Sequence, residues 1–471
     1  MNPDPGSFRD RSGRVYRDGD RVFRGLSSAA LEAWQQLERC GLYANLREGE
    51  RIVGTRLVPS PEVPPALAAL GWSAVLEHDA VPFVSHPWEW PFEMLRDAAL
   101  LELDVLDEAL AKGMVLRDGT AHNVQFLGAR PVFIDVPSLG PYRAGETWAG
   151  YRQFCSEFLN PLLLESARSL PAHVLLRGAL GGVPPGVCAG ALSTRDLFRR
   201  GVLTHVWLHA KADSRYRGTG HNVRSELALA GFSAELVKRN SRSLRRAIEA
   251  LPEPRQESAW EGYETNTSYT ADDTRLKEEV VRRATAARAA RLVWDLGANT
   301  GHYSRIAAEA APCVVAIDSD AGCVGRLYAS LRNTRERRIL PLLGDVTDPS
   351  PGLGWRLGER GPLESRGRPD VVLALALVHH VVLHGNVRTE ELADWLMGLG
   401  RTLVVEFVTK DDPMAKRLLL NRDDQFEDYD LKAFEAALER RGRIVERHLL
   451  CEGTRVLLVC EVSVPTSHTA A

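Results

Sequence analysis

Metal-binding cysteine pairs are absent from this chain of 471 residues. Its seven cysteines are scattered and odd in number, and no two of them form a C-x-x-C pair. This pattern argues against a structural zinc site and against a disulfide framework. We therefore expect no metal site, and we expect reduced thiols in a cytoplasmic protein.

Long apolar runs are also missing. No stretch reaches the roughly 18 apolar residues that a membrane helix needs, and the polar start, MNPDPGSFRDRSGR, lacks the apolar core of a signal peptide. We therefore expect no membrane partner. The longest apolar stretch, residues 371–382, is interrupted by His379 and His380, and it predicts a buried strand that runs into a loop.

A basic excess is lacking as well. The chain has 59 Lys and Arg residues against 62 Asp and Glu residues, which gives a formal net charge of -3. Dedicated nucleic-acid-binding proteins usually carry excess basic charge, so nucleic acid is not an expected partner. Residues 238–246 are a candidate for a local basic patch.

The length is enough for two or three domains at about 100–200 residues each. Residues 1–20 are polar and are predicted to lack regular structure, whereas an apolar stripe predicts a strong helix over 92–114. A polar, proline-containing stretch at 252–265 indicates a linker. We divide the chain into a first domain (1–195), a helical connector (196–264) and a second domain (265–471).

The second domain alternates predicted helices and strands, which indicates an α/β fold with a doubly wound, mostly parallel sheet. The last two strands are separated only by CEGT and predict a terminal hairpin. The seven expected strands are 291–296, 313–318, 338–343, 370–377, 401–407, 443–449 and 455–463.

A glycine-containing turn follows the first of these strands, in the sequence RLVWDLGANTG. Such a turn places backbone N–H groups at the carboxyl edge of the sheet, where open α/β sheets bind ligands. Gly297 and Gly301 allow close approach of the backbone, and Asn299 can donate or accept hydrogen bonds. The turn is therefore a candidate ligand site.

Acidic residues follow the next two strands. Asp318 ends the second strand, where a carboxylate accepts hydrogen bonds from ribose hydroxyls. Asp345 follows the third strand and is placed to take an adenine amino group. An NAD site is the alternative, but its G-x-G-x-x-G spacing is not present at this turn.

This ordered set resembles class I S-adenosylmethionine-dependent methyltransferases over residues 265–465. The resemblance implies a Rossmann-like domain with S-adenosyl-L-methionine as cofactor. The residues that match the family's cofactor contacts are Asp295, Gly297, Asn299, Gly301, Asp318, Asp345 and Val346. Upstream, Tyr263 and Tyr269 match a segment that closes over the cofactor in this family, although a packing linker is the alternative.

Three residues are candidates for the transfer chemistry. His379 and His380 follow the fourth strand, next to the expected methyl position, and either could act as a general base or orient the acceptor. The alternative is that they are structural and bonded to a backbone carbonyl. Glu406 ends the fifth strand and is the third candidate. The alternative is that this carboxylate supports the site without reacting, or lies on the surface.

The first domain contains MVLRDGTAHNVQFLGARPVFIDVPSL at 114–139, which resembles the catalytic segment of protein kinases and aminoglycoside phosphotransferases. Asp118 and Asn123 match the H-R-D-x-x-x-x-N loop, and Asp135 matches the D-F-G aspartate. The sequence departs from that pattern, because the H-R-D histidine is Leu116 and no lysine precedes residue 80. We therefore expect a degenerate α+β kinase-like domain.

The pairing of the two domains resembles a bacterial group that includes nodulation-protein-like methyltransferases. It implies a methyltransferase that acts on a small molecule or biosynthetic intermediate, with O-methylation preferred. A kinase-like phosphotransferase or ATP-binding protein with an accessory methyltransferase domain, and a non-catalytic ligand-binding scaffold, are the alternatives. The expected partners are a small-molecule acceptor and, in a homodimer, a second copy of the chain.

Overall fold

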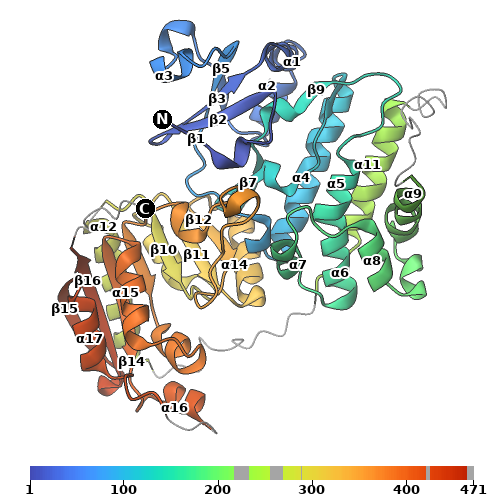
Figure 1. Ribbon diagram of the computed structural model, residues 1–471. Coiled ribbons are helices and arrows are strands. Elements are labelled where there is room, and N and C mark those ends of the chain that lie inside the picture. Colours follow the sequence, from blue (N-terminus) through green and yellow to red (C-terminus); the bar gives the residue numbers. More distant parts are fainter. Residues whose placement is uncertain (217–232, 255–268, 288, 421–424, 464–471) are drawn as a thin grey trace. The chain divides into compact units, whose positions relative to one another are not determined.

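The computed structural model describes residues 1–216, 233–254, 269–287, 289–420 and 425–463. Contacts divide the chain into two compact units, which Figure 1 shows with their elements labelled. Unit 1 comprises Met1–Arg255 and Gly352–Gly361, and unit 2 comprises Gln256–Pro351 and Pro362–Ala471. The expected connector at 196–264 as a separate part stays a prediction.

Unit 1 begins with a five-stranded antiparallel sheet in the order β1-β2-β3-β5-β4. Its strands are β1 (Asn2–Pro3), β2 (Gly13–Asp18), β3 (Arg21–Leu26), β4 (Thr55–Leu57) and β5 (Ala74–His78). The expectation that residues 1–20 lack regular structure was wrong. The hairpin turn at Gly19, whose φ is 59°, lets polar β2 pair with β3 while Tyr16 faces the core.

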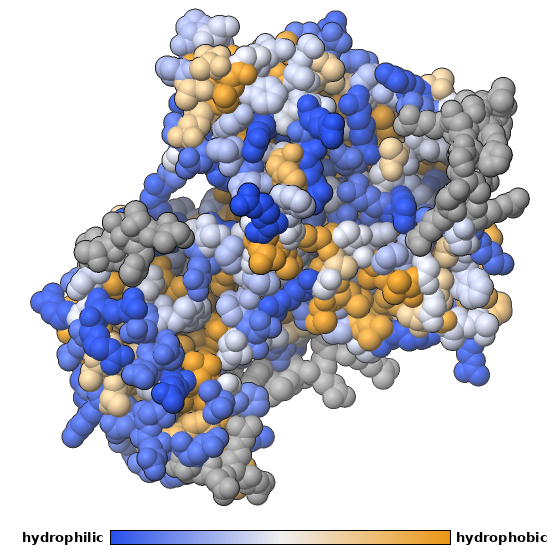
Figure 2. All heavy atoms as spheres, in the orientation of Figure 1, coloured by the Kyte–Doolittle hydropathy of each residue, from blue (hydrophilic) through white to orange (hydrophobic). Residues whose placement is uncertain are grey.

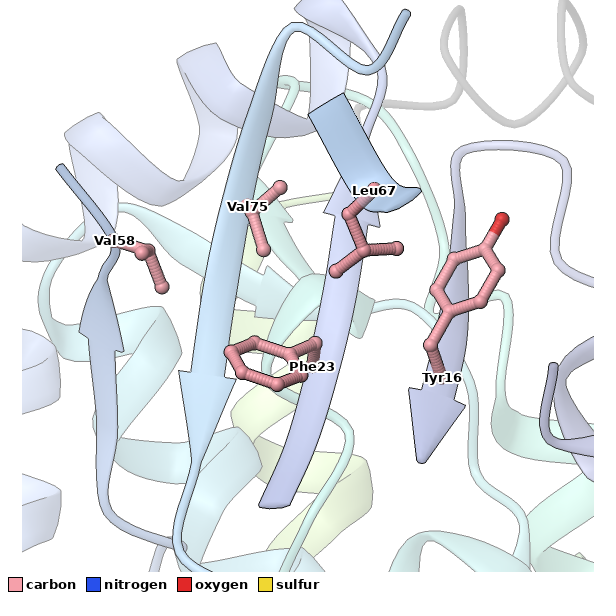
Figure 3. Close-up of a cluster of buried hydrophobic side chains, with 5 residues drawn as sticks. All are labelled: Tyr16, Phe23, Val58, Leu67 and Val75. Carbon is pink, nitrogen blue, oxygen red and sulfur yellow. The ribbon is translucent and has the colours of Figure 1, made fainter. Parts of the chain in front are cut away.

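A small apolar cluster stabilises this sheet. Figure 3 shows Tyr16, Phe23, Val58, Leu67 and Val75, which are all buried. Tyr16, Phe23 and Val75 lie on β2, β3 and β5, Val58 directly follows β4, and Leu67 lies on helix α3 (Pro65–Ala68), so burial of apolar surface holds the sheet and the helix together. The cluster fixes β3, the strand that leads into the first helix.

The rest of unit 1 is mainly helical. The predicted helix over 92–114 is α4, and its apolar stripe is buried. Two short antiparallel pairs, β6 with β9 and β7 with β8, follow it. The remaining bounds are α1 (Ser28–Arg39), α2 (Leu42–Glu48), α4 (Phe92–Ala111), β6 (Met114–Leu116), β7 (Val124–Leu127), β8 (Arg130–Phe133), β9 (Leu139–Pro141), α5 (Tyr151–Phe154), α6 (Asn160–Arg168), α7 (Ala172–Gly178), α8 (Pro185–Ala191), α9 (His209–Tyr216) and α11 (Ala234–Glu249).

Unit 2 is built on a seven-stranded sheet in the order β12-β11-β10-β13-β14-β16-β15. The first five of these strands are parallel, and β16 runs antiparallel to both of its neighbours. This confirms the predicted α/β Rossmann-like fold with a terminal hairpin. The strands are β10 (Val293–Leu296), β11 (Val314–Asp318), β12 (Ile339–Leu343), β13 (Val371–Ala374), β14 (Thr402–Val408), β15 (Gly442–Leu450) and β16 (Arg455–Val462).

Burial explains this arrangement. The central strands β10 and β13 are buried along their whole length, whereas the edge strand β15 alternates between half-buried and exposed residues. The sheet packs with α12 (Ala271–Ala287), α13 (His302–Ala307), α14 (Ala321–Thr334), α15 (Thr389–Leu399) and α17 (Leu431–Glu439), whereas α16 (Pro413–Leu419) contacts the π-helical turn His380–His384. The order reverses at β10, so a ligand crevice is expected at the carboxyl ends of β10 and β13.

The apolar stretch 371–382 differs from the prediction in its second half. The strand β13 ends at Ala374, and a π-helical turn (His380–His384) follows where a loop was expected.

On the face drawn in Figure 2, hydrophilic residues are interspersed with hydrophobic patches. Within the described ranges, no helix is both long enough and apolar enough to cross a membrane.

Candidate cofactor and active site

The backbone of the turn after β10 adopts the left-handed region at three positions, two of which are glycines. Gly297, Asn299 and Gly301 all have positive φ angles, of 75°, 50° and 81°. A Cβ atom on Gly301 would lie 2.6 Å from the Leu327 side chain, so only glycine fits there. The turn is held to β11 by the Gly297 N–H, which donates to the Ile317 carbonyl at 2.9 Å.

Two carboxylates hold this turn in place by accepting hydrogen bonds from its residues and from neighbouring ones. Asp295 is buried and accepts a 2.5 Å hydrogen bond from the Ser304 hydroxyl, and burial raises its pKa to about 6. Asp318, at the end of β11, accepts hydrogen bonds from the backbone N–H groups of Asn299 (2.7 Å) and Asp320 (2.9 Å). Burial raises the pKa of Asp318. Asp318 therefore joins the glycine turn to the second strand.

Asp345 lies just beyond β12, in an exposed turn. Its carboxylate accepts hydrogen bonds from the N–H (2.8 Å) and the hydroxyl (2.7 Å) of Thr347, and Val346 beside it is half-buried. Because β10, β11 and β12 are adjacent and parallel, the residues that follow them lie along one edge of the sheet. The structure therefore brings the predicted cofactor residues to a common edge.

His379 and His380 follow β13 with their ring centroids 4.0 Å apart. His379 is fully buried, and neither ring nitrogen has a hydrogen-bond partner among the described residues. Burial, together with His380 and Arg455, holds the pKa of His379 well below its usual range, and burial lowers the pKa of His380 to about 4. The backbone-carbonyl bond considered as the alternative is not found for His379, which is a neutral imidazole with both nitrogens unused.

Glu406 lies in a network of buried charges. Its carboxylate accepts hydrogen bonds from the Lys277 ammonium (2.7 Å) and the Tyr269 hydroxyl (2.5 Å), and Arg455 lies 3.5 Å away. Arg455 also donates to Asp412 at 2.7 Å and 3.2 Å. Burial alone would raise the pKa of Glu406, but Lys277 and Arg455 hold it below its ordinary value. Glu406 is thus an ionised, fully paired carboxylate.

Tyr269 is the centre of this network. Its hydroxyl also accepts hydrogen bonds from Lys277 (2.9 Å) and Arg455 (2.5 Å). Lys277, Arg455 and Asp412 were not predicted, because nothing in their spacing separates a buried charge from a surface one. The other predicted tyrosine, Tyr263, lies outside the described residues.

The kinase-like segment of unit 1 is held by an acidic anchor. Glu157 accepts hydrogen bonds from the Thr120 hydroxyl (2.7 Å) and the Ala121 N–H (3.0 Å), within the loop that carries Asp118 and Asn123. The Asn123 carbonyl accepts a 2.9 Å hydrogen bond from the Ile134 N–H, next to Asp135. The structure therefore joins the two predicted motifs.

Asp135 is paired with a cation that sequence reasoning missed. Arg24, on β3, donates to its carboxylate at 2.5 Å. Burial and the charge of Asp135 raise the pKa of Asp118. In the part of the chain that the structure describes, no three His, Cys, Asp or Glu residues are grouped to hold a metal ion. This pair could not be predicted from the sequence, because Arg24 lies on β3, directly before α1, and is far from Asp135 along the chain.

The strand order, the left-handed turn after β10 and the carboxylates that follow β10, β11 and β12 give unit 2 the Rossmann-like fold of the class I methyltransferases. No protein-family model matches the chain. The chain is 36% identical to the nodulation protein NoeA of Rhizobium meliloti (strain 1021) over 468 residues, which cover 97% of this chain and 96% of that protein. The chain belongs to the family of this nodulation protein.

Solved structures also show similarity to this chain. The N-methyltransferase NodS of Bradyrhizobium japonicum WM9, with S-adenosyl-L-homocysteine, is 11% identical and covers 44% of this chain and 93% of its own, with a TM-score of 0.30. The magnesium protoporphyrin IX methyltransferase of Synechocystis PCC 6803 is 18% identical and covers 41% and 86%, with a TM-score of 0.29. The bifunctional kinase-methyltransferase WbdD is 16% identical and covers 46% and 45%, with a TM-score of 0.30.

Proposed function

We propose that this chain is an S-adenosylmethionine-dependent methyltransferase that transfers a methyl group to a hydroxyl of a small molecule or biosynthetic intermediate. His379 carries the proposal, because it is neutral, buried and without a partner at either ring nitrogen. A neutral imidazole can take the proton that a hydroxyl releases when it is methylated. A buried polar group without a partner costs free energy, so its retention here supports a role in contacting a ligand.

The proposed cofactor contacts are assigned to the residues at the carboxyl edge of the sheet. In the proposed site, Gly297, Asn299 and Gly301 present the turn backbone to the amino-acid part of S-adenosylmethionine. Asp318 accepts hydrogen bonds from the ribose hydroxyls, while Asp345 and Val346 hold the adenine. Gly301 lets the turn pack directly against Leu327 of α14, where a Cβ would collide, and this packing holds the turn in place. When bound, the cofactor supplies the electrophilic methyl group.

The remaining candidates have supporting roles in this proposal. Glu406 cannot act as a free base while Lys277 and Tyr269 hold its carboxylate. We assign Glu406 and Tyr269 to fixing α12 against β14 and β16, beside the cofactor turn. His380, whose ring lies 4.0 Å from that of His379 at an interplanar angle of 40°, is proposed to orient the catalytic ring.

The phosphotransferase alternative is less well supported. The Arg24 guanidinium already neutralises Asp135, the residue that would ligate magnesium in a kinase. Unit 1 is therefore proposed to be a degenerate kinase-like domain. Homodimer formation and the identity of the acceptor stay predictions for solution experiments.

Removing the Asp318 carboxylate tests the cofactor site. We expect Asp318→Ala to weaken S-adenosylhomocysteine binding about 100-fold, because a hydrogen bond to a charged group contributes about 1.5–3 kcal/mol. Isothermal titration calorimetry measures the Kd directly. Asp272→Ala is the control, since Asp272 is an 82% exposed acid of the same unit. Equal affinity of the wild type and Asp318→Ala would refute the assigned ribose contact, and no binding by the wild type would refute the function.

The pH profile tests the state of His379. A base acts only when neutral, and the pKa of His379 is held below its ordinary value of 6.5, so activity is lost only as the pH falls through that lowered pKa. We expect kcat to stay constant from pH 8 down to about pH 6. S-adenosylhomocysteine affinity measured over the same range is the control. A half-maximal rate at pH 6.5 or above would contradict a neutral, buried base.

A further inference from the structure

The segment that carries the paired histidines is closed by backbone hydrogen bonds at both of its ends. We call residues 377–385, which lie within unit 2, the histidine turn. At its start, the N–H groups of His380 and Val381 donate to the Leu377 carbonyl at 2.9 Å and 3.2 Å. At its end, the Gly385 N–H donates to the His380 carbonyl at 2.9 Å and closes a π-helical turn. Single π-helical turns are frequent at functional sites.

The start of the histidine turn packs against the glycine turn after β10, which is also in unit 2. A Cβ atom on Gly297 would lie 3.2 Å from the Leu377 side chain, so Leu377 lies directly against the backbone of the glycine turn. The first end of the histidine turn therefore contacts the residues proposed to hold the amino-acid part of the cofactor.

The end of the histidine turn packs against Thr347, which follows β12 in the same unit. A Cβ atom on Gly385 would lie 2.7 Å from the Thr347 methyl carbon and 2.6 Å from the Val381 carbonyl oxygen, which is too close for either contact. The φ angle of Gly385 is -78°, which any residue adopts. The close packing, and not the backbone conformation, therefore requires glycine at this position.

Thr347 also holds the carboxylate of Asp345. Its N–H and its hydroxyl both donate to Oδ1 of Asp345, at 2.8 Å and 2.7 Å. The hydroxyl and the methyl of this one side chain thus make different contacts, with Asp345 and with Gly385. Because a β-branched side chain has restricted freedom about χ1, the two contacts constrain one another.

We propose that Thr347 is a positioning residue for the methyl transfer. Its hydroxyl holds the Asp345 carboxylate toward the adenine, and its methyl holds the end of the histidine turn, so that His379 keeps its orientation. Cofactor binding and order in the histidine turn then strengthen one another by the same factor, as linkage requires. The inference rests on the proposed function, because it uses the proposed roles of Asp345 and His379.

Two substitutions at Thr347 separate its two contacts in the full-length chain. Thr347→Val keeps the methyl and removes the hydroxyl, so we expect the Kd of S-adenosylhomocysteine to rise about three-fold while kcat at saturating cofactor stays near the wild-type value. Thr347→Ser keeps the hydroxyl and removes the methyl, so we expect kcat to fall about five-fold with an unchanged Kd, because the rate depends steeply on the placement of the reacting groups. Transfer of labelled methyl from S-adenosylmethionine to pooled small molecules measures kcat.

Each substitution has a matched control in unit 2. Thr334→Val should change neither quantity, because Thr334 is an exposed threonine at the end of α14 whose hydroxyl donates to the Leu331 carbonyl at 3.1 Å. Gly385→Ala inserts a methyl into the tight contact and should lower kcat about ten-fold or more. Gly398→Ala should not, because a Cβ atom there meets nothing within 4 Å.

Hydrogen exchange provides a measurement that needs no acceptor. S-adenosylhomocysteine should slow amide exchange in the histidine turn of the wild type and of Thr347→Val, and by a smaller factor in Thr347→Ser. A wild-type chain that binds no S-adenosylhomocysteine would overturn the proposed function. Binding without slower exchange in the histidine turn, or identical effects of Thr347→Val and Thr347→Ser on Kd and kcat, would overturn the role of Thr347 alone. If Gly385→Ala does not fold, the two Thr347 variants decide.

Discussion

Replacing His379 with asparagine is expected to lower kcat for methyl transfer by about 100- to 10,000-fold while the Kd of S-adenosylhomocysteine stays nearly unchanged. The expected loss is large because the imidazole is proposed to take the proton of the acceptor hydroxyl, and asparagine cannot. His379 makes no hydrogen bond within the described part of the chain that the substitution would break. The stability of unit 2 should therefore change less than the rate.

The assay needs an acceptor, which transfer of labelled methyl from S-adenosylmethionine to pooled small molecules can supply. His384→Asn is the matched control, because His384 is an exposed histidine of the same π-helical turn. It should retain near-wild-type kcat. If His379→Asn retains wild-type kcat as well, the base assignment is wrong. If it loses cofactor binding instead, His379 has a structural role.

Replacing Glu406 with glutamine should destabilise unit 2 by about 3–5 kcal/mol, because it leaves the buried Lys277 ammonium without its counter-charge. The Lys277 and Glu406 side chains are 2% and 0% exposed, so water cannot compensate for the loss. The midpoint of urea unfolding, followed by circular dichroism, reports the change. The pKa of Glu406 lies below its ordinary 4.5, so its contribution is complete above that pH and is lost as the pH falls through the lowered pKa.

A double variant distinguishes charge pairing from packing. Lys277→Met combined with Glu406→Gln should cost less than the two single losses added together, because the unpaired charge is removed. Glu309→Gln is the exposed control, since Glu309 pairs with Arg282 at 2.8 Å on the surface of the same unit, and it should cause no measurable change. Strict additivity of the buried pair would show that packing, and not the ion pair, dominates.

The cofactor edge could be predicted because strand ends are marked in the sequence. Apolar runs such as those before Asp318 and Asp345 identify buried parallel strands, and parallel strands place the residues after them on one edge. The same logic located His379. The mostly parallel sheet and its terminal hairpin also followed from the alternation of strands with helices and from the short CEGT connection.

The charge network and the assignment of residues 352–361 to unit 1 could not be predicted in the same way. Lys277 lies in a helix rich in charged residues, and its burial depends on Glu406, which is far away in sequence. Arg24 is one of several arginines in a polar hairpin, and only the fold pairs it with Asp135. The segment around Glu359 has no periodic pattern, so its assignment to unit 1 required three-dimensional contacts.

The assignment of residues 352–361 to unit 1 also bears on how the two parts of the chain were joined. Along the sequence, the polypeptide passes from one unit to the other three times, whereas end-to-end joining of two genes creates a single crossing. Simple end-to-end joining therefore does not account for residues 352–361, which lie between β12 and β13. A chain that lost residues 1–255 would leave Glu359 without Arg9, its hydrogen-bond partner in unit 1.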